Sequence, residues 1–223
     1  MRFTRTFASF PALRALALVS GLVCSLGSGA ARGAPVAGYD IVGTGGAFAS
    51  TGSATVGFRF STDDTIFVSA LGVFDRFSDG LATAHEIGLW TDDGALLASV
   101  TVGAGTAGTL AGGFRYADIT DIELSAGTYR IGAQFFLGGD AFLTAPAMTA
   151  ADGIVLLNPT TILAGFGAGV AFPSFSSAPQ AAAANFLFAA SPTSETVPEP
   201  SAVALMGLGV VAAGLSRRRR RSV

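Results

Sequence analysis

The sequence predicts an all-β protein, an antiparallel β-sandwich of jelly-roll or Ig-like type, flanked by an N-terminal signal helix and a C-terminal hydrophobic helix. Three observations lead to this prediction. Apolar residues in the central region recur with period two, as in Val56, Phe58 and Phe60, which is the pattern of a half-buried strand. Short turns rich in Gly and Asp separate the candidate strands. No stretch between these turns has a convincing amphipathic helical period.

The candidate strands follow one another at the short spacing that is typical of a sandwich. After the stretch around Phe58 we expect strands at 65–74, 85–91, 95–102, 114–124, 128–136, 153–157 and 185–189. Turn signals fall between them at 62–64, 78–80, 92–94, 126–127 and 138–140. The interval 141–184 is less regular, and we expect long loops between the late strands at 165–169, 172–175 and 181–184, where a sandwich usually carries its binding function.

Composition divides the 223-residue chain into four parts. Residues 1–34 form a predicted signal peptide, 35–190 the β-sandwich domain, 191–196 a polar linker and 197–223 a sorting signal. The first part has arginines before an apolar stretch and small residues after it, the layout of a secretory signal, and we expect cleavage between Ala30 and Ala34. Cys24, the only cysteine, leaves with this signal, so the mature domain has no disulfide.

The C-terminal segment combines three features in a fixed order: Pro198-Glu199-Pro200, an apolar run over 202–215, and the basic cluster Arg217, Arg218, Arg219, Arg220 and Arg221. Arginines beside a membrane span stay on the cytoplasmic side. The apolar run of about 14 residues covers roughly 21 Å of a hydrocarbon core roughly 30 Å thick, which suits a temporary anchor.

These residues resemble the PEP-CTERM sorting signal of Gram-negative bacteria. The resemblance implies Sec export, an inner-membrane intermediate held transiently by the C-terminal helix, cleavage by an exosortase, and delivery to the cell surface or the extracellular polysaccharide matrix. An ordinary C-terminal tail anchor is the alternative.

A second resemblance covers most of the mature region. The segments 71–75, 85–90, 93–98 and 124–129, with 185–188 as a closing strand, are similar to an uncharacterised β-sandwich domain of secreted bacterial surface proteins. The shared features are structural and imply no reaction. We expect the Tyr129 hydroxyl to bond nearby backbone as in a tyrosine corner, and Trp90 to face the core, with solvent as the alternative.

Few residues are available for catalysis, and we expect no enzyme and no catalytic residue. His85 is the only histidine and lacks the second histidine of a zinc motif. The chain has no lysine and no mature cysteine, which excludes Schiff-base and thiolate chemistry. Residues 103–108 fit Gly-x-Gly-x-x-Gly, but no helix pattern follows, so we expect a hairpin loop there and no nucleotide site.

Acidic loops carry the weak candidates for a metal site. Asp75, Asp79, Asp92 and Asp93 offer the oxygen ligands that Ca²⁺ takes. Asp is also a favoured turn residue, so we expect no resident metal or cofactor, with Ca²⁺ as the alternative.

The charge distribution bounds the partners. A product cut near Glu199 keeps four arginines against fifteen carboxylates, a net charge of −11, which disfavours nucleic acid. The sequence therefore favours an exported, non-enzymatic surface or matrix protein. Two other classes stay open: a carbohydrate-binding module that docks on exopolysaccharide, and a glycoside-active enzyme with two carboxylates facing each other across a cleft.

Overall fold

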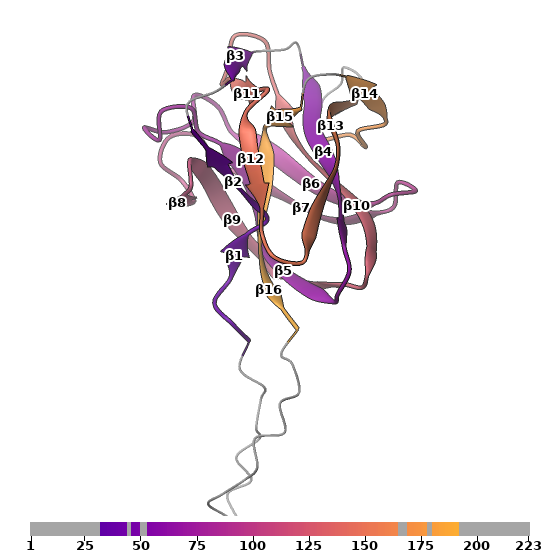
Figure 1. The fold of residues 1–223 in the computed structure, drawn as a ribbon. Coiled ribbons are helices and arrows are strands. Elements are labelled where there is room, and N and C mark those ends of the chain that lie inside the picture. Colours follow the sequence, from indigo (N-terminus) through magenta and orange to yellow (C-terminus); the bar gives the residue numbers. More distant parts are fainter. Residues whose placement is uncertain (1–31, 44–45, 50–52, 165–168, 178–179, 192–223) are drawn as a thin grey trace, which may run out of the picture. The chain divides into compact units, whose positions relative to one another are not determined.

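The computed structural model describes residues 32–43, 46–49, 53–164, 169–177 and 180–191. Every regular element in these ranges is a strand, and most belong to two antiparallel sheets, so the all-β sandwich prediction is confirmed (Figure 1). The expected signal helix and C-terminal hydrophobic helix fall outside the described residues. Within those ranges, no helix has the length and apolar character needed to cross a membrane.

The larger sheet has six strands in the order β14-β13-β4-β10-β6-β7. Its strands are β4 (Ala54–Thr62), β6 (His85–Thr91), β7 (Leu96–Val102), β10 (Gly127–Phe135), β13 (Ile154–Ala164) and β14 (Phe175–Ser177). Arg130 in β10 lies directly opposite Arg59 in β4 and Trp90 in β6. Because paired residues point to the same side of a sheet, this register brings three large side chains together on one face.

The second sheet has five strands in the order β1-β16-β5-β9-β8. Its strands are β1 (Val36–Ala37), β5 (Ile66–Phe74), β8 (Thr109–Ala111), β9 (Phe114–Leu124) and β16 (Ala184–Ala190). Two small sheets complete the described fold, β15-β11-β3 and β12-β2. Their strands are β2 (Tyr39–Val42), β3 (Ala47–Ala49), β11 (Phe142–Thr144), β12 (Ala147–Ala150) and β15 (Ala181–Ala182).

The hydrophobic core lies between the two large sheets. Val56, Phe58 and Phe60, whose alternation predicts β4, are fully buried in it. The Phe60 ring stacks on Phe186 of the other sheet with 4.6 Å between the ring centroids. Burying a side chain of this size contributes roughly 1.5–3 kcal/mol, so these phenylalanines stabilise a domain that has no disulfide.

Most predicted strands match the observed ones. The strands expected at 85–91 and 114–124 have these bounds in the structure. Those expected at 65–74 and 95–102 differ by one residue at the start, and those expected at 128–136 and 185–189 differ by one residue at both ends. Residues 103–108 lie between β7 and β8 and contain no helix, as expected. The Tyr129 hydroxyl donates a 2.8 Å hydrogen bond to the Ser125 carbonyl oxygen, which confirms the tyrosine corner.

Of the loops expected in the interval 141–184, the described stretch 169–174 contains no strand, but the expectation is wrong at 181–184, which contains β15 and the start of β16. The strands β11, β12 and β14 in the same interval are not among the predicted ones. The short strands cannot be predicted from the sequence, because a strand of two to four residues is too short to show a period. In addition, β11 and β12 pair with β3 and β2, which lie far away in the chain. β13 extends beyond the expected end at Leu157, with an irregular register before Ile162. Pro159 lies in this irregular part, where a sheet tolerates a residue without an N–H group.

Both ends of the domain lie on the same side of the sandwich. β1 pairs with β16, with Val36 opposite Phe188, at the lower end of Figure 1. β5 begins near this end, with Ile66 opposite Ala190, and runs away from it to Phe74. We call the end of the sandwich near Phe74 the distal end.

Candidate functional site

The predicted sorting residues, Pro198-Glu199-Pro200 and the cluster Arg217–Arg221, lie outside the described residues. The structure does describe the point from which they continue. The Ser191 amide donates a 3.1 Å hydrogen bond to the Thr65 carbonyl oxygen, and the polar linker begins there. Because β1 adjoins β16, the two targeting segments join the domain at the same end.

Arg32, which sequence analysis includes in the signal peptide 1–34, contacts the folded domain. Its guanidinium pairs with the Asp121 carboxylate on β9 and lies over the Phe67 ring of β5, 3.8 Å from the ring centroid. Both partners belong to the five-stranded sheet. The sandwich therefore uses a side chain located before the predicted start of the mature domain.

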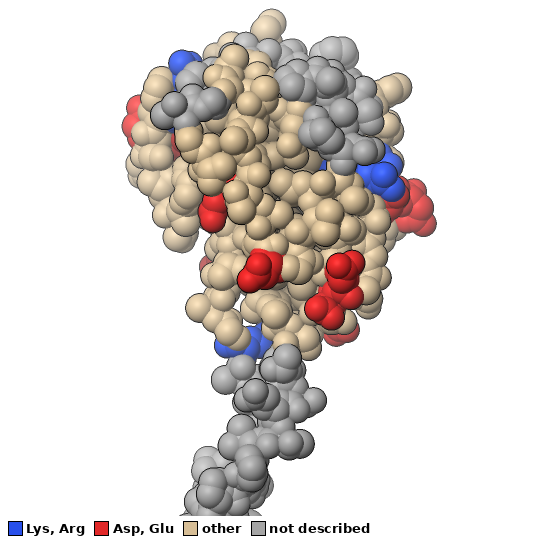
Figure 2. Space-filling model, viewed as in Figure 1, with Lys and Arg blue, Asp and Glu red and all other residues tan. Residues whose placement is uncertain are grey.

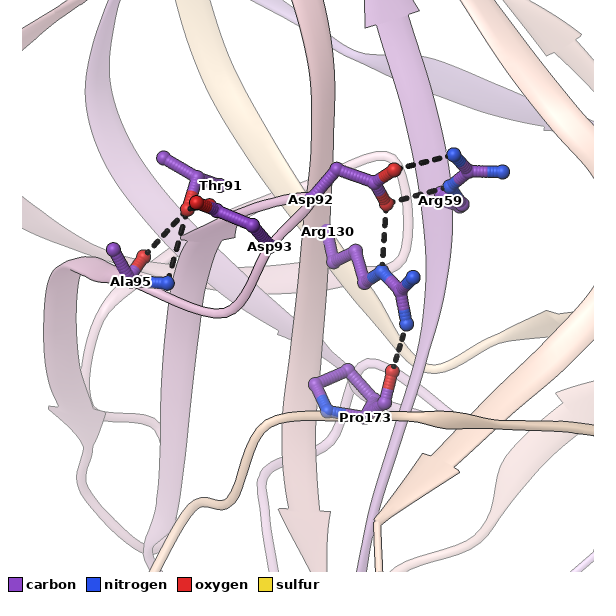
Figure 3. Close-up of polar contacts among 7 residues, drawn as sticks. All are labelled: Arg59, Thr91, Asp92, Asp93, Ala95, Arg130 and Pro173. Atoms are coloured by element: carbon purple, nitrogen blue, oxygen red, sulfur yellow. Dashed lines mark hydrogen bonds and ion pairs between the residues drawn. The ribbon is translucent and has the colours of Figure 1, made fainter.

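Asp92 lies in an arginine cluster on the six-stranded sheet (Figure 3). Arg59 donates to both of its carboxylate oxygens, with 2.6 Å between Nε and Oδ1, and Arg130 Nε donates to the same Oδ1 at 2.9 Å. The hydrogen bond from Arg59 is the largest effect that lowers the pKa of Asp92, from 3.8 to about 2. Two arginines thus occupy the carboxylate that was a candidate ligand for Ca²⁺.

Asp93 belongs to the adjacent turn and has a structural contact of its own. Its carboxylate accepts a hydrogen bond from the Thr91 hydroxyl. The same hydroxyl accepts a 3.0 Å hydrogen bond from the Ala95 amide, which closes the β6–β7 hairpin. Both aspartates of this turn therefore bind groups of the protein itself, Asp92 across the sheet and Asp93 within the hairpin.

Trp90 is buried, as expected, but in a second cluster on the outer face of the six-stranded sheet. The indole lies over Gly88, where an added Cβ would come within 2.3 Å of its ring. Gly88 alternates with Ile87 and Leu89, which face the core between the sheets. Phe172 meets the indole edge-on with 6.2 Å between the ring centroids, and Trp90 is only 3% exposed.

Residues 169–175, here called the covering segment, lie on this outer face. Glu86 accepts a 3.0 Å hydrogen bond from the Val170 amide, and Thr55 accepts one of 2.9 Å from the Ala171 amide. Arg130 Nη1 donates a 2.8 Å hydrogen bond to the Pro173 carbonyl oxygen. A row of paired glycines, Gly57, Gly132 and Gly88, crosses the three strands beneath. An added side chain would collide with the Ile131 carbonyl at Gly57, with the Thr55 methyl at Gly132 and with the Trp90 ring at Gly88, so only glycine fits at these positions.

Asp75 lies at the distal end in a buried ion pair. Its Oδ2 accepts a 2.6 Å hydrogen bond from Arg115 Nε and a 3.0 Å one from the Gly80 amide. The Asp75 side chain is 2% exposed and that of Arg115 is 5% exposed. Since a buried charge needs a partner, each residue of the pair requires the other. This carboxylate holds the β5–β6 loop in place.

His85 and Asp140 form a second polar pair at this end. His85 Nε2 lies 2.8 Å from Asp140 Oδ2, and Nδ1 lies 2.6 Å from the Gln134 carbonyl oxygen. Asp140 also accepts hydrogen bonds from the Ala82 and Thr83 amides. Burial raises the pKa of Asp140, but the hydrogen bonds from His85 and the two amides outweigh burial, and the net shift is downward. The pair fastens the β10–β11 loop to the start of β6.

A pocket of about 180 Å³ lies between the β5–β6 loop and the β10–β11 loop. It is lined mainly by polar groups of Asp75, Arg76, Phe77, Asp79, Gly80, Gly139, Asp140 and Ala141. Phe77, at its rim, is 67% exposed. Of the four candidate calcium ligands the structure brings Asp75 and Asp79 to this pocket, and it keeps Asp92 and Asp93 together in a hairpin on the six-stranded sheet.

Asp140 and the arginines that bind Asp75 and Asp92 are not among the site residues predicted from the sequence. Asp140 is 55 residues from His85, and Arg115 is 40 residues from Asp75. No local pattern reports such pairs. The sequence does show that the domain has only four arginines. With so few cations among many carboxylates, each arginine is a candidate partner for a carboxylate.

The described surface carries more acid than base. On the face drawn in Figure 2, acidic side chains form several separate patches, and basic ones appear only as isolated spots. In the described ranges, no three His, Cys, Asp or Glu side chains are grouped so that they could hold a metal ion.

Comparison with known proteins gives two family matches. Residues 42–173 match the family described as a domain of unknown function, DUF4082, and residues 196–221 match the PEP-CTERM protein-sorting motif. No curated protein and no solved structure matches the chain. The second match confirms the sorting signal: the protein is exported, associates with the membrane through this segment and is processed by an exosortase, as in Gram-negative bacteria.

Proposed function

Because this chain belongs to the DUF4082 family and ends in a PEP-CTERM sorting motif, we propose that its mature domain is a non-enzymatic component of the cell surface or extracellular matrix. The observation that carries the proposal is the sorting motif at 196–221, directly after the folded domain. The shared position of the two ends of the described domain, where β1 pairs with β16, supports it. A sandwich tethered by that end presents its distal end away from the membrane.

The contacts of the polar groups support a non-catalytic role. Asp75 is paired with Arg115, Asp92 with two arginines, and His85 with Asp140. A general acid or base needs an ionisable group that reaches a substrate, whereas these groups tie strands and loops together. In these three sets of contacts the ionisable side chains hold the fold together.

The test of this proposal is replacement of Arg217–Arg221 by glutamine in the full chain. The charges hold the C-terminal segment in its membrane topology, so the variant is expected to accumulate as uncut precursor. Mass spectrometry of each cell fraction measures this directly. Arg76→Gln, which removes an exposed arginine of the domain, is the matched control and should be sorted normally. Normal cleavage and surface delivery of the Arg217–Arg221 variant would contradict the proposal.

A second candidate is a carbohydrate-binding module that docks on exopolysaccharide. The polar pocket at the distal end favours it, with the exposed Phe77 ring beside carboxylates that can bond sugar hydroxyls. Phe77→Ala should then weaken retention on the host's exopolysaccharide, while Phe175→Ala, an equally exposed phenylalanine, should not. Equal retention of both variants and the wild type would exclude this pocket as the binding site.

A further inference from the structure

The pocket of about 180 Å³ at the distal end, here called the distal pocket, lies between two loops that each expose one large apolar side chain. Phe77, on the β5–β6 loop, belongs to the lining and is 67% exposed. Leu137, on the β10–β11 loop, is 81% exposed and lies two residues before Gly139 of the lining. A polar hollow bordered by apolar side chains suits a ligand that has both hydroxyl groups and an apolar face. A sugar ring has such a surface.

Hydrogen bonds between the two loops fix the shape of the distal pocket. Asp140, on the β10–β11 loop, accepts hydrogen bonds of 2.9 and 3.2 Å from the Ala82 and Thr83 amides of the β5–β6 loop. Ser78 has a φ of 59°, in the left-handed region that residues other than glycine rarely adopt. Arg115 Nη2 donates a 3.3 Å hydrogen bond to the Ser78 carbonyl oxygen and supports this conformation. Because the pocket is preformed, a ligand does not have to order its walls.

The size of the distal pocket limits the ligand to one ring. Its volume of about 180 Å³ equals that of roughly six water molecules at about 30 Å³ each. Pockets that enclose drug-sized ligands are larger, roughly 300–1,000 Å³. A single hexopyranose, with about 12 non-hydrogen atoms, is at the small end of the ligand range. The pocket therefore suits the last sugar of a chain or of a branch, and not a run of consecutive sugars.

The charges of the lining select against acidic sugars. Three of the eight lining residues are aspartates, against one arginine, Arg76. Asp75 and Asp140 already bind partners inside the protein. Asp79 is exposed, and its carboxylate can accept hydrogen bonds from sugar hydroxyls. The carboxylate of a uronic acid would instead lie among like charges, which repel it.

We propose that the distal pocket binds one uncharged hexopyranose at the end of a neutral polysaccharide chain. Its hydroxyls donate hydrogen bonds to Asp79, and its apolar face lies against Phe77. Arg76 covers one face of that ring, with its guanidinium 4.5 Å from the ring centroid, so the sugar meets the other face. The inference rests on the second candidate function above and adds the class of sugar and the part of the chain that is bound.

The experiment is saturation-transfer NMR on the mature protein isolated from its own cells, with D-glucose, D-galactose and D-mannose as neutral probes. D-Glucuronate and D-galacturonate are the acidic probes. We expect at least one neutral hexose to bind with a Kd on the order of millimolar, as suits so small a ligand. Both uronates should bind at least about tenfold more weakly, because of charge repulsion.

Asp79→Asn tests the assigned side chain. It removes a charged acceptor and should weaken hexose binding about three- to tenfold. It should also narrow the difference between hexose and uronate, an effect that a purely structural role of Asp79 would not produce. Asp63→Asn, the same change at an exposed position in the β4–β5 turn, is the matched control and should leave both affinities unchanged.

Uronates that bind as tightly as neutral hexoses would overturn the inference, and so would an Asp79→Asn variant that behaves like Asp63→Asn. If hexoses do not bind but the protein is retained on the host's exopolysaccharide, the single-sugar pocket is wrong and the second candidate function stands. A protein that binds neither the hexoses nor the exopolysaccharide would contradict both.

Discussion

Truncation of Trp90 to alanine should destabilise the domain by about 3–5 kcal/mol. The indole is only 3% exposed, and a buried aromatic of this kind covers on the order of 200 Å². At about 25 cal/mol per Å² this area corresponds to an upper estimate of about 5 kcal/mol. The truncation also removes the partner of Phe172 and so loosens the covering segment. At about 2–4 °C per kcal/mol, the expected fall in Tm is about 6–20 °C.

Thermal unfolding of the mature protein, followed by circular dichroism, measures this effect. Phe175→Ala is the control, since that ring is 67% exposed and its loss should change stability by less than about 0.5 kcal/mol. A Trp90→Ala variant whose Tm falls by less than about 2 °C would refute the buried position of the indole. If that stable variant also lost retention on exopolysaccharide, Trp90 would be a sugar-stacking residue and the carbohydrate-binding function would replace the structural one.

Three further predictions follow from the ion pairs. Asp75→Asn leaves Arg115 buried without its counter-charge and should cost about 3–5 kcal/mol in denaturant unfolding, whereas Asp79→Asn, at an exposed position, should cost little; equal effects would refute the buried pair. The pKa of Asp92 is about 2 in the folded protein against 3.8 ordinarily, so its stabilisation is present above about pH 5 and is lost as the pH falls through about 2. After allowance for partial exposure this amounts to about 1–2 kcal/mol, and the stability difference between wild type and Asp92→Asn should shrink over that range; a difference independent of pH would contradict it. Because Arg32 contacts the domain, the mature chain should begin at Ala31, and mass spectrometry that finds a start beyond Arg32 would show that these contacts form only in the precursor.

The strands of the sandwich could be predicted where their own residues alternate clearly. β4 follows from Val56, Phe58 and Phe60, because one face of the strand meets the core and the other does not. The short strands β11 and β12 could not, because they exist only through pairing with segments at the other end of the domain. Trp90 shows the same limit: alternation with Ile87 and Leu89 places the indole on the opposite face of the sheet, but that face is buried only because the covering segment, more than 75 residues later, lies on it.

Local sequence patterns are sufficient to predict the targeting and the fold class of this protein. The sorting signal consists of a Pro-Glu-Pro motif, an apolar run and arginines that follow one another directly in the chain. Such a signal can be read from the sequence, because it depends on neighbouring residues and not on contacts between distant ones. Alternation of apolar residues likewise acts within one strand. The roles of the charged residues emerge only in the folded domain, because Asp75, Asp92 and Asp140 each bind a partner 33 or more residues away. The position of β7 at the edge of the six-stranded sheet also depends on the whole fold. A strand becomes an edge only through the order in which all strands of the sheet pair.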